Sequence, residues 1–233
     1  MKDRTLILGC SNLFGAYDEN DKFDITTSWV YKYFDPEYTD AFGFPGHGTI
    51  TFCQFIDFLG PKLQDYDNLI VLETIEPRII AGDYHKPINE VFADMYAKKD
   101  KDIIVSMFQT DDDMESCNML VPWRNDKFLS RYATSYRIGI LKYAKETHQY
   151  IQRDNIQEHL TRSLTMYMKE YLKNRYINVH MLNHFRMAHK QNTPQVKNNW
   201  NKNGHANIIL TNRINKKIYD ELCEKGFIQR RGG

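Results

Sequence analysis

The sequence lacks a long apolar run and is sparing in glycine, proline and cysteine. No stretch of about 18 consecutive apolar residues occurs, which excludes a membrane-spanning helix. Its 12 glycines and 7 prolines are too few for a collagen-like chain, and its 26% charged residues argue against a disordered one. The 233 residues are 42% hydrophobic, which is enough for one sizeable core and indicates a single domain over residues 1–233.

The four cysteines are too scattered to form a paired-cysteine zinc site. They are Cys10, Cys53, Cys117 and Cys223. The first apolar stretch, Leu6-Ile7-Leu8, is shorter than the core of a secretory signal and is typical of a strand. We therefore expect a cytoplasmic protein with free thiols, no metal and no cofactor.

Charge is divided unevenly along the chain. Residues 1–150 hold 16 Lys and Arg against 24 Asp and Glu, whereas residues 151–233 hold 15 against 6. The favoured interpretation is electrostatic complementarity between two layers of one domain. The alternative is a basic face that binds a polyanion such as nucleic acid.

Short apolar segments alternate with helical patterns. Strands are predicted at Thr5–Leu8, Ala41–Phe44, Leu69–Leu72 and Ile177–Met181, with Ile103–Phe108 as a fifth candidate. Helices are predicted at Trp29–Phe34, Ile50–Leu63, Ile156–Leu172 and Leu210–Leu222. This alternation predicts an α/β fold, a three-layer sandwich with a central parallel sheet. Residues 82–135 fit the alternation worst and are interpreted as an insertion or lid over the sheet edge.

Parallel sheets bind ligands at the carboxyl ends of their strands, so the residues after each strand are the first candidates for chemistry. The first strand runs into Gly9-Cys10-Ser11, which would place a serine nucleophile beside the N-terminus of a helix, although Ser11 could simply cap that helix. A glycine-rich loop with Gly46 follows the second strand. His205 precedes the last helix and could act as a general base.

These segments, in this order, resemble the SGNH or GDSL-like hydrolase family, and the Gly-Cys-Ser opening with Trp29 downstream is similar to a divergent branch found in phages and bacteria. The resemblance implies a flavodoxin-like fold with Ser11 as nucleophile and His205 as base. It also implies that the backbone amides of Ser11 and Gly46 form the oxyanion hole.

Two family positions differ in this chain. Ile75 stands where the family has an oxyanion-hole Asn, so Thr74 or Asn12 is the candidate replacement donor. Lys202 stands where the family has the Asp that orients the histidine. Asn203 or Glu76 is then the candidate acceptor for the second imidazole nitrogen.

Other residues have weaker functional interpretations. Arg78 could bind an anionic group of the substrate, or form a surface ion pair. A zinc site at His180, His184 and His189 is disfavoured because His180 falls within a predicted strand and no carboxylate accompanies the three histidines. The acidic run at residues 111–113 is interpreted as a solvated loop. Four tyrosines near arginines could stack on a sugar or base, or pack between helices; they are Tyr132, Tyr136, Tyr143 and Tyr150.

The sequence thus predicts a serine esterase or acyl hydrolase that acts on a small or carbohydrate-linked ester through an acyl-enzyme on Ser11. The alternatives are an acyltransferase of the same fold, or a catalytically weakened module that binds a polyanion. No membrane partner is expected, and the sequence does not indicate an oligomeric state.

Overall fold

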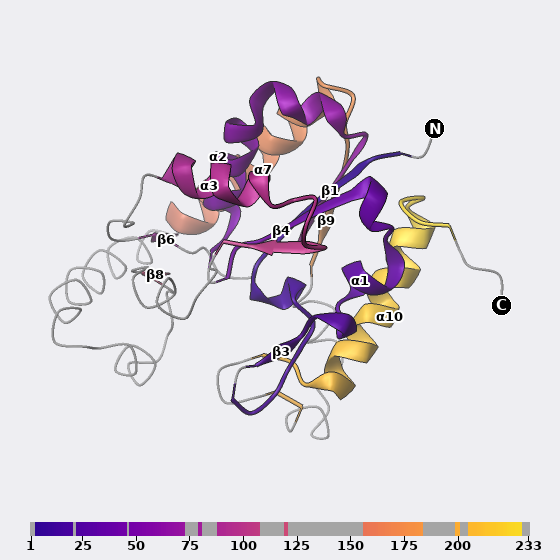
Figure 1. Cartoon of the computed structure of the whole chain (residues 1–233). Coiled ribbons are helices and arrows are strands. Elements are labelled where there is room, and N and C mark those ends of the chain that lie inside the picture. The colour runs from indigo at the N-terminus through magenta and orange to yellow at the C-terminus, as the bar shows by residue number, and fades with distance from the viewer. Residues whose placement is uncertain are drawn as a thin grey trace, which may run out of the picture.

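The computed structural model describes residues 3–20, 22–45, 47–72, 79–80, 88–107, 119–120, 156–183, 199–200 and 205–229. Five parallel strands form its central sheet in the order β7-β4-β1-β5-β9 (Figure 1). Their bounds are Thr5–Gly9 for β1, Thr39–Gly43 for β4, Asn68–Leu72 for β5, Ile104–Ser106 for β7 and Asn178–Leu182 for β9.

Helices cover both faces of this sheet (Figure 1). One face carries α1 (Trp29–Tyr33) and α10 (Ile208–Glu224). The other carries α2 (Thr49–Leu59), α3 (Ile88–Ala97) and α7 (Ile156–Lys173). The described residues therefore form the α/β sandwich that the sequence predicts.

The other elements within the described ranges are short. Four 3-10 turns are η1 (Ser11–Leu13), η2 (Ile25–Thr27), η3 (Pro36–Tyr38) and η4 (Gly60–Asp65). Two antiparallel pairs join β2 (Ala16–Tyr17) to β3 (Phe23–Asp24), and β6 (Ile79–Ile80) to β8 (Met119–Leu120).

The strands are apolar throughout because both sheet faces are buried. On β1, Leu6 and Leu8 belong to the core beneath α2, α3 and α7, whereas Ile7 belongs to the core beneath α10. Side chains alternate between the two faces of a strand, so a strand covered on both sides needs an apolar residue at every position. The run Leu6-Ile7-Leu8 meets that requirement, and all three side chains are fully buried.

Helix α10 forms through a regular four-residue spacing and a strong N-cap. Leu210, Ile214, Ile218 and Leu222 are each at most 2% exposed, as expected for one apolar helix face turned to the sheet. The Asn207 side chain accepts hydrogen bonds from the amides of residues 209 and 210. This cap fixes where the helix begins, and therefore fixes the chain just after His205.

The predicted strands and helices are confirmed, with bounds shifted by a few residues at most sites. The largest difference is at Ile50–Leu63, where α2 ends at Leu59 and the 3-10 turn η4 follows. The β2–β3 pair and α3 were not expected. Each strand of the pair has only two residues, too short for a period-2 pattern to be visible.

Strand order departs from the flavodoxin order on one edge. Numbered along the chain, the five strands lie in the order 4-2-1-3-5, whereas the flavodoxin order is 2-1-3-4-5. The difference is β7, which pairs with β4 at the sheet edge. With β7 set aside, the order β4-β1-β5-β9 is 2-1-3-4, as in flavodoxin.

The segment that contains β7 lies within residues 82–135, which the sequence favours as an insertion or lid. Its described part is α3 and β7, and both belong to the sandwich, since Phe92 and Met95 of α3 are fully buried. Apart from the β8 residues, residues 108–135 lie outside the described part of the chain. For them the insertion or lid stays a prediction.

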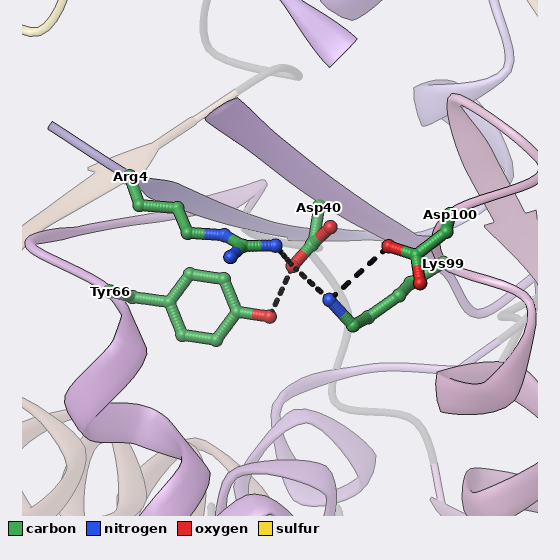
Figure 2. Close-up of polar contacts among 5 residues, drawn as sticks. All are labelled: Arg4, Asp40, Tyr66, Lys99 and Asp100. Carbon is green, nitrogen blue, oxygen red and sulfur yellow. Dashed lines mark hydrogen bonds and ion pairs between the residues drawn. The ribbon is translucent and has the colours of Figure 1, made fainter. Parts of the chain in front are cut away.

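A polar cluster lies at the amino ends of the strands, opposite to the edge where β1 leads into η1 (Figure 2). Asp40 of β4 is 4% exposed, and its Oδ2 accepts a 2.5 Å hydrogen bond from the Tyr66 hydroxyl. The same oxygen lies 3.3 Å from an Arg4 guanidinium nitrogen and 3.5 Å from Lys99 Nζ. The two cations and the hydroxyl together compensate the buried carboxylate. Burial, followed by this hydrogen bond, raises the pKa of Tyr66.

None of the helices in the described ranges is both long and apolar enough to cross a membrane.

Candidate functional site

Ser11 lies at the carboxyl edge of the sheet, where β1 ends and η1 begins. Cys10 occupies the N-cap position of η1 and makes no side-chain capping bond, while Ser11 is the first residue of the turn. The Ser11 amide is therefore one of the first N–H groups of the turn. Such groups make no hydrogen bond to a carbonyl within the turn itself. The Ser11 side chain is partly exposed, as a nucleophile that must reach a substrate requires.

His205 lies directly against Ser11, although 194 residues separate them in the sequence. His205 Nε2 is 3.2 Å from Ser11 Oγ, which is within the reach expected of a nucleophile and its base. The N-cap of α10 and a bond from the Tyr17 amide to the Ala206 carbonyl (3.0 Å) fix the backbone on the C-terminal side of His205. The nucleophile and base of the sequence hypothesis are thus adjacent.

Tyr17 contacts both members of this pair. Its ring stacks on the His205 imidazole, with the ring centroids 4.1 Å apart and the planes 20° apart. Its hydroxyl donates a 2.7 Å hydrogen bond to the Ser11 carbonyl. Tyr17 is 7% exposed, so the stacked ring closes one side of the imidazole from water.

A tight turn brings Tyr17 back over Ser11. Gly15 has a φ of +101°, and an added Cβ would lie 2.5 Å from Thr27 Oγ1 and 2.6 Å from the Asp24 carbonyl. Only glycine fits this backbone conformation and this space. The Thr27 hydroxyl also accepts a 2.6 Å hydrogen bond from the Ala16 amide, which holds the start of β2 in place.

The interior of the loop from Ser11 to Ser28 is held by buried hydrogen bonds. Ser28 is fully buried, and its hydroxyl donates to the Leu13 carbonyl at 2.7 Å while it caps α1 through the Val30 amide at 3.2 Å. Asn215 of α10 donates a 2.6 Å bond to the Thr27 carbonyl. These bonds anchor the segment between η1 and α1 to the helix that follows His205.

The second glycine-rich segment approaches the nucleophile turn through its backbone. The Phe44 amide donates a 2.7 Å hydrogen bond to the Gly9 carbonyl, and the His47 amide bonds to the Phe44 carbonyl at 3.0 Å. Gly43 makes room for the Phe14 ring, since a Cβ there would lie 2.3 Å from the Phe14 Cζ atom. Gly46, the expected oxyanion-hole residue, lies outside the described residues.

Thr74 and Asn12 are the candidate replacements for the oxyanion-hole Asn of the family, and of these two the structure describes Asn12. Its side chain is 8% exposed, and Nδ2 donates to Cys10 Sγ at 3.6 Å. Sulfur is a weak acceptor, so this contact is weaker than an ordinary amide hydrogen bond. Cys10 is 1% exposed, so a substrate has little access to its thiol.

Several predicted site residues lie outside the described part of the chain. They are Thr74, Glu76, Arg78, Lys202 and Asn203, together with His184, His189, the acidic run 111–113 and the four tyrosines of residues 132–150. Their roles stay predictions.

His180 has a carboxylate partner rather than a metal-like environment. On β9, its Nε2 lies 2.9 Å from Glu221 Oε1 on α10, and its ring packs near Phe227. Across the ranges that the structure covers, no three His, Cys, Asp or Glu side chains are grouped so that they could hold a metal ion.

The thiols within the described ranges are unpaired: Cys10, Cys53 and Cys223. Cys117 lies outside those ranges. Burial, with a smaller contribution from the Asp57 carboxylate, raises the pKa of Cys53 to about 11. A thiol with that pKa carries almost no thiolate near neutral pH and is a poor nucleophile.

Sequence reasoning missed Tyr17. Gly15, two residues earlier, marks a turn, but neither the stack on His205 nor the bond to Ser11 follows from a local pattern. Both contacts depend on the tertiary position of the loop before α10.

No family model matches this chain, and comparisons with curated proteins and with solved structures found no match.

Proposed function

We propose that this protein is a serine esterase or acyl hydrolase of the SGNH type. The observation that supports the proposal is the 3.2 Å approach of His205 Nε2 to Ser11 Oγ at the carboxyl edge of a parallel sheet. In the proposed reaction His205 takes the hydroxyl proton, and Ser11 Oγ attacks the ester carbonyl. The tetrahedral intermediate then collapses, and His205 gives its proton to the departing alcohol. Water repeats the sequence on the acyl-enzyme, releasing the acid.

The oxyanion of the intermediate needs hydrogen-bond donors that are already in place. The Ser11 amide, at the start of η1, is one proposed donor, and the Gly46 amide is the second. Asn12 is the proposed replacement for the side-chain donor of the family, since it follows Ser11 in the turn and, among the described residues, its amide donates to the weak acceptor Cys10 Sγ. Removing one such donor from a hydrolase costs about 10²–10³ in rate, so the proposed reaction depends on the Asn12 amide taking that place.

The fold also supports the proposal. The strands β4, β1, β5 and β9 follow the first four places of the flavodoxin order once the edge strand β7 is set aside. Ser11 follows the first strand and His205 precedes the last helix, as the family resemblance requires. By that resemblance, the proposed substrate is a small polar ester such as an O-acylated sugar.

The test is hydrolysis of chromogenic short-chain esters by the purified protein and four variants. Ser11→Ala and His205→Gln should each abolish turnover above background. Ser163→Ala and His180→Gln are the matched controls, because Ser163 is an exposed α7 residue and His180 is paired with Glu221. Both controls should retain wild-type turnover.

Equal turnover in Ser11→Ala and the wild type would contradict the proposal, as would a wild type inactive across ester types. An acyltransferase would give a different pattern, in which the acyl group passes to an added alcohol or sugar acceptor faster than to water. Only the acceptor distinguishes that reaction, because the acyl-enzyme on Ser11 is common to both. The polyanion-binding module stays a prediction that no contact among the described residues favours.

A further inference from the structure

One side chain links the two halves of the proposed catalytic pair. Tyr17 stacks on the face of the His205 imidazole at 4.1 Å, and its hydroxyl bonds to the Ser11 carbonyl at 2.7 Å. Its amide bonds to the carbonyl of Ala206, the residue after the base. Three separate contacts from one residue thus reach the nucleophile turn and the loop that carries the base.

A catalytic imidazole must be held in one orientation toward its nucleophile. Serine hydrolases usually do this with a carboxylate on the second ring nitrogen. Lys202 stands at the family position of that carboxylate. A ring stacked within 20° of the imidazole plane opposes rotation of the imidazole, because turning the two rings out of parallel would bring them into collision.

The hydroxyl of Tyr17 acts on the other partner. The Ser11 carbonyl accepts from the Tyr17 hydroxyl and, at 3.2 Å, from the Phe14 amide. Both acceptor positions of this oxygen are therefore used, which fixes the peptide plane between Ser11 and Asn12. A fixed peptide plane restricts the position of the Ser11 Cα and therefore the direction of the Ser11 side chain.

Tyr17 is itself held firmly enough to position other groups. It pairs with Phe23 in the β2–β3 ladder, and their rings lie 5.9 Å apart. The Gly15 turn and the bond from the Ala16 amide to Thr27 set the backbone just before it. With 7% of its surface exposed, the ring has little room to leave the imidazole.

We infer that Tyr17 is the positioning residue of the Ser11–His205 pair, holding the imidazole by its ring and the serine by its hydroxyl. The inference rests on the proposed function. It separates two roles within one side chain, and these two roles respond to different substitutions. Tyr17→Phe keeps the stack and removes the bond to Ser11, whereas Tyr17→Leu removes both.

The first measurement needs no turnover. Long-range ¹H–¹⁵N spectra of imidazoles report which nitrogen of His205 carries the proton, with the His205→Gln variant identifying its signals. The wild type and Tyr17→Phe should show one dominant tautomer, protonated on Nδ1, since Nε2 must accept from Ser11. Tyr17→Leu should show imidazole signals broadened by exchange, because without the stacked ring the imidazole can turn away from Ser11 Oγ.

The second measurement is ester hydrolysis at saturating and limiting substrate. Tyr17→Phe should lower kcat about tenfold, the effect of one lost neutral hydrogen bond, with little change in KM. Tyr17→Leu should lower kcat by about 10², the scale expected when a catalytic group is misplaced by an ångström. Tyr33→Leu is the matched control, because Tyr33 packs on Tyr219 and contacts neither Ser11 nor His205.

The outcomes distinguish the two claims. Ser11-dependent turnover with unchanged imidazole signals and unchanged kcat in Tyr17→Leu would overturn the positioning role and leave the proposed function intact. Broadened imidazole signals in Tyr17→Leu, in a protein without Ser11-dependent turnover, would support the positioning role and overturn the proposed function. If Tyr17→Leu does not fold, Tyr17→Met replaces it, since the flexible methionine fills the space without a ring.

Discussion

The buried hydrogen bond from Tyr66 to Asp40 should make a measurable contribution to stability (Figure 2). Tyr66→Phe removes one hydroxyl and leaves the rest of the ring in the core. A hydrogen bond to a charged group contributes about 1.5–3 kcal/mol. Arg4 and Lys99 still contact the carboxylate at 3.3 and 3.5 Å, so Asp40 is not left without partners. We therefore expect the lower end, a loss of about 1.5 kcal/mol.

Removing the carboxylate should cost more than removing the hydroxyl. Asp40→Asn leaves Arg4 and Lys99 near a neutral amide, and breaking a buried pair costs about 3–5 kcal/mol. The Arg4 side chain is 37% exposed, which allows water to replace part of the lost interaction, so we expect about 3 kcal/mol. The double variant should lose less than the sum of the two, since both changes remove the same hydrogen bond.

Urea unfolding followed by circular dichroism measures these differences. For a chain of this size the Tyr66→Phe loss corresponds to about 3–6 °C in the melting temperature. Tyr31→Phe is the control, because Tyr31 is 46% exposed on α1 and should change stability little. If Tyr66→Phe unfolds at the same urea concentration as Tyr31→Phe, the reasoning about the buried carboxylate is refuted.

Three further predictions follow from burial and backbone geometry. The pKa of Tyr66 is raised in the folded protein, so above about pH 10 the unfolded chain loses this proton first. The free energy of unfolding should therefore fall as the pH rises, by up to about 1.4 kcal/mol per pH unit from this group. The fall should be less steep in Tyr66→Phe. The pKa of about 11 at Cys53 predicts alkylation by iodoacetamide about 10² times slower at pH 8 than for an ordinary thiol with a pKa near 9, measured by peptide mass spectrometry; an equal rate would contradict it. Gly15→Ala should lower the free energy of unfolding in urea by about 2–4 kcal/mol, because the added Cβ would collide with Thr27. Gly60 also has a positive φ but has open space around it, so Gly60→Ala should cost only about 1 kcal/mol. Equal losses would show that the collision at Gly15 is relieved.

Much of the sandwich was predictable because its elements are amphipathic or fully apolar. The four-residue spacing from Leu210 to Leu222 is sufficient to predict α10, and the run Leu6-Ile7-Leu8 is sufficient to predict a strand buried on both faces. Helix α3 carries a comparable signal in Ile88, Val91, Phe92 and Met95, which follow helical spacing. This spacing indicates a helix, but the interpretation of residues 82–135 as an insertion did not include one.

Strand order could not be predicted to the same degree. Each strand is defined by its own residues, but the choice of neighbour depends on how the connecting segments cross the sheet. β7 has only three residues and pairs at the edge with β4, so nothing in Ile104–Ser106 indicates its neighbour.

The candidate site was predictable where a strand-end rule and a family pattern agreed. Ser11 follows a buried strand and His205 precedes a helix, and the two side chains lie adjacent. Tyr17 was not predictable, because its stack on His205 joins residues 188 positions apart and depends on the Gly15 turn. The spacing of six residues between Ser11 and Tyr17 does not by itself predict a contact between them.

The most direct measurement of the central claim is covalent labelling with a serine-reactive phosphonate. The nucleophile should displace the phosphonate leaving group, and peptide mass spectrometry should locate the adduct on Ser11. His205→Gln should label far more slowly, because it leaves Ser11 Oγ without its proposed base. An adduct on Ser11 that requires His205 is the predicted result. An unlabelled wild type, or labelling at another residue that is indifferent to His205→Gln, would contradict the account.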